Sequence, residues 1–122
     1  MNGINYLSDT NCFVYLLDEN PLLLPFTKSG WAYSFITEME VLSKKNITLK
    51  QDSIIRQMLA ACFKIDHNQT ITELTIKLRR KYSLKLPDAI IAASAQYMQL
   101  PLLTADKAFA QIKEIDCFIL EL

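Results

Sequence analysis

Four acidic residues stand where strands would end or helices would begin. Asp9 follows the apolar segment 4–8, and Glu40 lies just after the aromatic segment 31–36. Asp88 opens a long apolar run after Pro87, and Asp106 follows the short segment 102–104. Carboxylates that crowd together resist ionisation unless a cation is near. Oxygen ligands without cysteine or histidine partners favour Mg²⁺ or Mn²⁺ over zinc.

The chemistry available to such a group is hydrolysis of a phosphodiester without a covalent intermediate. A divalent ion held by carboxylates lowers the pKa of bound water and stabilises both oxygens of an in-line displacement. The only histidine, His67, is more typical of a surface or capping position than of a general base. Two glycines are too few for a phosphate-binding loop. Asn11 stands where a phosphatase with a D-x-D pair would need its second acid.

The elements that must position these acids alternate between strand and helix. Apolar and β-branched segments predict short strands at 4–8, 31–36, 63–65, 102–104 and 117–120. Helical patterns lie between them, and residues 86–98 are apolar nearly all round, which indicates a buried helix. This order predicts an α/β fold with a mostly parallel sheet of about five short strands flanked by helices. Ligands bind such sheets outside the carboxyl ends of the strands, where the four acids would converge.

Three of the acids also have a purely structural explanation. Asp9 and Asp106 precede helical segments and would serve as N-caps. Asp88 would complement the dipole of the helix that begins near Pro87. Taken singly, none of these residues indicates catalysis, and the hypothesis depends on their joint arrangement.

Glu40 has a structural explanation of its own. It lies three residues after Thr37, which is the spacing of a capping box, and that reading is favoured when the pair is considered alone. The same spacing recurs at 48–51 and 70–73. We therefore expect capping boxes at all three places.

Composition fits a single domain over residues 1–122. The chain has 13 basic and 13 acidic residues and a net charge of zero, so it carries no overall attraction for nucleic acid. Its densest basic cluster, at 79–81 and 85, is more typical of a solvated helix face. We expect the protein to lie in a reducing compartment, the cytoplasm. Its three cysteines are widely spaced, and we see no basic and apolar leader and no apolar run long enough to span a membrane.

Four segments contain the acids: LSDTN at 7–11, SFITEME at 34–40, LPDAIIAA at 86–93 and LLTADKAF at 102–109. Together they resemble the PIN domain family, and most closely its VapC-type toxins. The third is the most specific, and the four occur in the family's order and spacing. The resemblance spans nearly the whole chain.

The resemblance implies a Rossmann-like fold and an endoribonuclease that depends on Mg²⁺ or Mn²⁺. It makes Asp9, Glu40, Asp88 and Asp106 the catalytic and metal-binding acids. Asn11, Thr37 and Thr104 would be supporting residues that orient carboxylates, water or a phosphate. It also implies an RNA substrate, with tRNA as one candidate, a homodimer, and a VapB-like antitoxin that covers the site.

Two other functions stay open from the sequence. One is a PIN-fold interaction module that no longer cleaves; the presence of all four acids argues against it. The other is a metal-dependent phosphohydrolase acting on small molecules, which the weak basic character of the chain allows.

Overall fold

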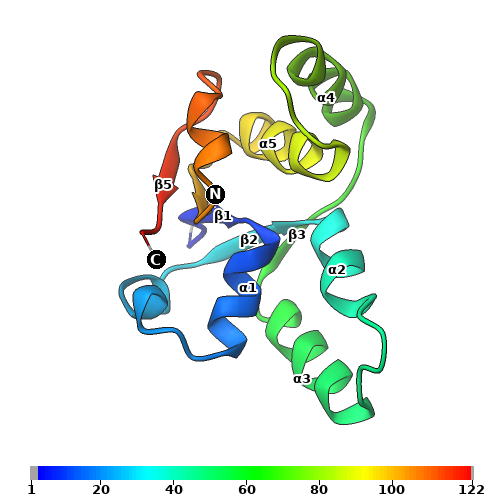
Figure 1. The fold of residues 1–122 in the computed structure, drawn as a ribbon, viewed down its shortest axis with the longest axis vertical. Coiled ribbons are helices and arrows are strands. Elements are labelled where there is room, and N and C mark those ends of the chain that lie inside the picture. Colours follow the sequence, from blue (N-terminus) through cyan, green and yellow to red (C-terminus); the bar gives the residue numbers. More distant parts are fainter. Residues whose placement is uncertain (1–2, 122) are drawn as a thin grey trace.

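The computed structural model describes residues 3–121 of the chain. Five parallel strands form one sheet in the order β3-β2-β1-β4-β5 (Figure 1). The strands are β1 (Tyr6–Ser8), β2 (Trp31–Ser34), β3 (Phe63–Ile65), β4 (Leu102–Thr104) and β5 (Cys117–Ile119). The helices are α1 (Thr10–Leu17), η1 (Pro21–Phe26), α2 (Phe35–Leu42), α3 (Leu49–Ala60), α4 (Gln69–Lys81), α5 (Leu86–Met98) and η2 (Lys107–Gln111). The predicted α/β fold with a parallel sheet is confirmed.

Helices cover both faces of this sheet. Figure 1 shows α1, α2 and α3 on one side and α4 and α5 on the other. Two clusters of buried side chains result, one centred on Phe13 and Trp31, the other on Leu7 and Ile91. Burial on both faces explains why the central strands β2 and β4 are buried along their whole length rather than at alternate residues.

Helix α5 is the most deeply buried helix, as its sequence predicted. Ala89, Ala92 and Ala93 are fully buried. Small side chains let a helix backbone approach its neighbours closely, and α5 packs along α4 and against β2. Its bounds, 86–98, agree with the prediction. Asp88 lies in its first turn, so that acid is fixed by a rigid element.

The start of α2 corrects the sequence analysis. Strand β2 ends at Ser34, and Phe35 and Ile36 are already helical, although their side chains favour a strand. The Ser34 hydroxyl oxygen accepts a 3.3 Å hydrogen bond from the Ile36 N–H and caps the helix. Because the helix begins two residues early, Thr37 lies inside its first turn and forms no capping box with Glu40. The cap thus overrides the β propensity of the two residues that follow it.

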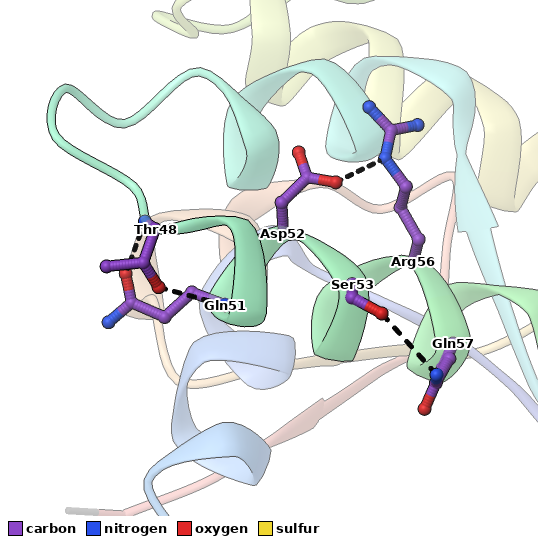
Figure 2. Close-up of polar contacts among 6 residues, drawn as sticks. All are labelled: Thr48, Gln51, Asp52, Ser53, Arg56 and Gln57. Atoms are coloured by element: carbon purple, nitrogen blue, oxygen red, sulfur yellow. Dashed lines mark hydrogen bonds and ion pairs between the residues drawn. The ribbon is translucent and has the colours of Figure 1, made fainter.

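The other two expected capping boxes have different outcomes. At α3, the Thr48 hydroxyl accepts from the Gln51 N–H at 3.1 Å, and the Gln51 side chain accepts from the Thr48 N–H at 3.0 Å (Figure 2). That box is confirmed. At α4, Asn68 is the N-cap and accepts from the Ile71 N–H at 2.9 Å. The prediction of a capping box at 70–73 is wrong, because the helix already begins at Gln69, with Asn68 as its N-cap.

No helix between residues 3 and 121 is both long enough and apolar enough to span a membrane.

Candidate active site

The topology brings the ends of three strands to one edge of the sheet. Strand β1 lies between β2 and β4 and pairs with both. Asp9 follows β1 directly, Asp106 follows β4 by two residues, and α2, which carries Glu40, follows β2 without a loop. The first turn of α5 adds Asp88. The fold therefore places the ends of β1 and β4, the start of α2 and the first turn of α5 at this edge. That the four acids act there as one site stays a prediction.

Asp9 is the most buried of the four acids. Its side chain is 5% exposed and caps α1, where Oδ1 accepts a 2.7 Å hydrogen bond from the Thr10 N–H. Its other oxygen, Oδ2, accepts from the Thr104 hydroxyl at 2.9 Å. Burial raises the pKa of Asp9 to about 6; the two hydrogen bonds oppose the shift, and the charges of Asp88 and Asp106 add to it.

The same electrostatic contacts connect the remaining acids. The half-buried Asp88 has a raised pKa, first because of burial and then because of the charges of Asp106 and Glu40. Lys85 opposes this shift. The charges of Asp88 and Asp106 therefore act on Asp9, and those of Asp106 and Glu40 act on Asp88.

Thr104 joins two of these acids. Its hydroxyl donates to Asp9 Oδ2, and the same oxygen accepts a 3.0 Å hydrogen bond from the Asp106 N–H. The Asp106 side chain is exposed and caps η2 through a 2.9 Å bond from the Ala108 N–H. The structural explanation of Asp9 and Asp106 as caps is therefore correct, and it coexists with their place in the acidic group.

The supporting residue that sequence reasoning missed is Thr10. Its hydroxyl donates to Glu40 Oε1 at 2.7 Å and lies 3.0 Å from the hydroxyl of Thr37, which is fully buried. The signal in the sequence was the hydroxyl directly after Asp9. Asn11, by contrast, is exposed in the first turn of α1, and its side chain makes no hydrogen bond with any described residue.

The donor set fits a hard divalent cation. It consists of carboxylate and hydroxyl oxygens, and the pKa of Asp9 is raised mainly by its burial, with a smaller contribution from the charges of Asp88 and Asp106. Within residues 3–121, no three Asp, Glu, His or Cys side chains are arranged closely enough to enclose an ion. Mg²⁺ is usually held by one or two carboxylates and keeps several waters, so it needs no such enclosure.

Comparison with known proteins agrees with this geometry. The family model described as PIN domain matches residues 6–115. A search of curated proteins finds no significant match. Among solved structures, a chain of a toxin–antitoxin complex from Klebsiella pneumoniae is 35% identical; the match covers 91% of this chain and 95% of that chain, with a TM-score of 0.80.

More distant structures share the fold. A chain of VapBC-1 from nontypeable Haemophilus influenzae is 20% identical, with 95% of this chain and 98% of that chain covered and a TM-score of 0.83. A chain of the DNA-bound VapBC from Salmonella typhimurium is 17% identical, with 97% and 99% covered and a TM-score of 0.80. The chain therefore belongs to the PIN domain family, and it is a VapC-like member of that family, a group whose toxins are generally nucleases.

Proposed function

We propose that this protein is a toxin of the VapC type: an endoribonuclease that hydrolyses RNA phosphodiester bonds with metal-activated water. The observation that carries the proposal is the placement of the acids: Asp9 and Asp106 follow the adjacent strands β1 and β4, Asp88 lies in the first turn of α5, and Thr10 is hydrogen-bonded to both Asp9 and Glu40. The charges of acidic neighbours add to the raised pKa of Asp9 and of Asp88. Such crowding disfavours the folded protein unless a cation binds there. Residues 1–122 form a single PIN domain in this proposal, and it acts in the cytoplasm.

Asp9, Glu40, Asp88 and Asp106 are the groups that would hold Mg²⁺ or Mn²⁺. The bound ion supplies a water of lowered pKa and a counter-charge for the phosphate oxygens. Thr104 fixes the orientation of Asp9, since its hydroxyl holds Oδ2 while the Thr10 N–H holds Oδ1. Thr37 would support Glu40 through the hydroxyl of Thr10, and the exposed Asn11 would orient a bound water or phosphate rather than a carboxylate. No histidine acts as base, because the exposed His67 is hydrogen-bonded to Thr72 on α4.

The test is cleavage of a small-RNA pool, tRNA included, by purified protein. Reactions contain Mn²⁺ or Mg²⁺, or EDTA, and compare the wild type with Asp9→Asn. An Asp116→Asn variant is the matched control, because Asp116 is an exposed acid outside the group. We expect discrete cuts that require metal, persist in Asp116→Asn and vanish in Asp9→Asn.

The other outcomes identify the alternatives. A folded protein that neither binds Mn²⁺ nor cuts RNA would be an interaction module. A protein that binds Mn²⁺ and hydrolyses a small phosphodiester in preference to RNA would be a small-molecule phosphohydrolase. Either result would overturn the proposed ribonuclease.

The proposal includes a VapB-like antitoxin and a homodimer. We assign the antitoxin to a cavity of about 520 Å³ between α1 and α3. Its lining includes the apolar side chains of Val14, Leu17 and Ile54 and the basic residues Lys44 and Lys45. Co-expression with a neighbouring antitoxin gene tests this assignment. Ile54→Asp should prevent co-purification, whereas Ile76→Asp on α4 should not; both side chains are partly exposed, at 45% and 39%. Light scattering of the free protein tests the dimer.

A further inference from the structure

Glu40 differs from Asp9 in how freely its side chain could move. It is exposed on α2, and a glutamate has three rotatable side-chain bonds. A ligand that samples many rotamers binds a metal weakly, because ordering it opposes binding. Some contact must therefore hold Glu40 toward the other acids if it acts with them.

The only side-chain hydrogen bond to the Glu40 carboxylate within residues 3–121 comes from Thr10. The distance from Thr10 Oγ1 to Glu40 Oε1 is 2.7 Å, which is short, as expected of a charge-assisted bond. An ionised carboxylate only accepts, so the single hydroxyl proton of Thr10 is committed to Glu40. The buried Thr37 hydroxyl, 3.0 Å away, must then donate to Thr10. The three groups form one directed chain, from Thr37 through Thr10 to Glu40.

Thr10 also touches a second acid. Its backbone N–H donates to Asp9 Oδ1 at 2.7 Å. One residue therefore orients two carboxylates from elements that lie far apart in sequence, α1 and α2. Thr104, at the end of β4, contacts one carboxylate, that of Asp9, and accepts from the backbone N–H of Asp106. The two threonines approach Asp9 through different oxygens, one on each side.

We infer that Thr10 is a positioning residue of this site: its hydroxyl sets the Glu40 carboxylate relative to Asp9 and thereby sets the affinity for the divalent ion. The inference rests on the proposed function, because it assigns the acids to a metal. Removing a group that orients a metal-binding carboxylate typically weakens the affinity for the metal by about 10- to 100-fold.

The central variant is Thr10→Val, which keeps the β-branched shape and removes the hydroxyl. Thr10→Ser keeps a hydroxyl and is the conservative variant. Thr72→Val is the matched control, because the Thr72 hydroxyl is also hydrogen-bonded to a side chain, that of the exposed His67. Because Thr10→Val leaves the buried Thr37 hydroxyl without its partner, the double variant Thr10→Val/Thr37→Val separates this folding cost from the positioning role.

The readout is the affinity for Mn²⁺ alone, measured by calorimetry without RNA, together with thermal melting in EDTA. We expect Thr10→Val to raise the Kd for Mn²⁺ by about 10-fold or more, and Thr10→Ser and Thr72→Val to stay within about 3-fold of the wild type. The double variant should recover the melting temperature and still bind Mn²⁺ weakly. In cleavage assays, Thr10→Val should need more Mn²⁺ for half-maximal rate.

Two results would overturn the inference, and they are distinguishable. If the wild type binds Mn²⁺ and folded Thr10→Val binds it equally well, Thr10 has a structural role only, and the proposed function stands. If the wild type itself binds no Mn²⁺, the proposed function fails, and the inference fails with it.

Discussion

Replacing Asp9 by Asn should stabilise the metal-free protein while it removes activity. Burial and neighbouring acids raise the pKa of Asp9 from 3.8 to about 6. Each pKa unit corresponds to about 1.4 kcal/mol, so the ionised carboxylate costs the native state about 3 kcal/mol at pH 7. Asn keeps the size of Asp and an oxygen to accept from the Thr10 N–H, but it carries no charge.

The gain will be smaller than this ceiling. The Thr104 hydroxyl donates to Asp9 Oδ2, and an amide nitrogen in that position cannot accept it. Allowing about 1–2 kcal/mol for the weakened hydrogen bond, we expect a gain of about 1–2 kcal/mol. For a chain of this length, that corresponds to a rise in Tm of roughly 4–8 °C.

The pH dependence identifies the cause. Below about pH 4 the carboxyl is protonated in both the folded and the unfolded protein, so its charge costs nothing. As pH rises from about 4 to 6, the unfolded state releases the proton more readily than the native state, and the wild type loses stability through this residue. The advantage of Asp9→Asn should therefore be small at pH 4 and complete at pH 7.

Urea unfolding in EDTA at several pH values, on wild type and Asp9→Asn, measures this difference; Asp116→Asn is the control for a general effect of removing an acid. Saturating Mn²⁺ should reverse the order, because at 100 times Kd it stabilises the wild type by about 2.7 kcal/mol and the variant far less. If Asp9→Asn is no more stable than the wild type in EDTA at pH 7, or if its gain in unfolding free energy is the same at pH 4, the charge of Asp9 does not destabilise the metal-free fold.

Three further predictions test individual contacts. Thr104→Val should lower the free energy of unfolding by about 1–3 kcal/mol. It should also raise the pKa of Asp9 further, because the hydrogen bond that it removes lowers that pKa. Carbon-detected NMR titration measures the pKa, and an unchanged value would contradict this hydrogen bond. Thr48→Ala should cost about 1 kcal/mol in urea unfolding and Thr70→Ala less than about 0.5, because only Thr48 caps a helix; equal costs would contradict this. Gly30→Ala should destabilise by at least about 2 kcal/mol, since its Cβ would lie 1.5 Å from a backbone oxygen; a wild-type Tm would exclude that clash.

Sequence alone predicted the elements whose signals are local and mutually consistent. Helix α5 was predicted correctly because its apolar run, Pro87 and Asp88 all indicate the same start. The start of α2 was missed because two local preferences compete there: Phe35 and Ile36 favour a strand, and Ser34 favours a helix cap. The structure resolves the conflict in favour of the cap, and that choice removes Thr37 and Glu40 from capping.

The site could be predicted only as far as topology carries it. Parallel strands end at one edge, so acids placed after them must approach each other, and this needs no side-chain detail. The role of Thr10 could not be read in this way, because its hydroxyl reaches an acid on α2, 30 residues away. Such a contact depends on the packing of α1 against α2, which periodicity does not specify.

The structural and the chemical explanations of Asp9 are distinguished by charge rather than by geometry. As an N-cap, Asp9 needs only an acceptor oxygen, and Asn or Ser would supply one without the cost of a buried charge. The raised pKa shows that this carboxylate is unfavourable in the metal-free fold. A residue that opposes folding where a neutral equivalent would suffice is best explained by a ligand that repays the cost, and for crowded carboxylates that ligand is a cation. Stability in EDTA and affinity for Mn²⁺ should therefore change in opposite directions when Asp9 is replaced by Asn.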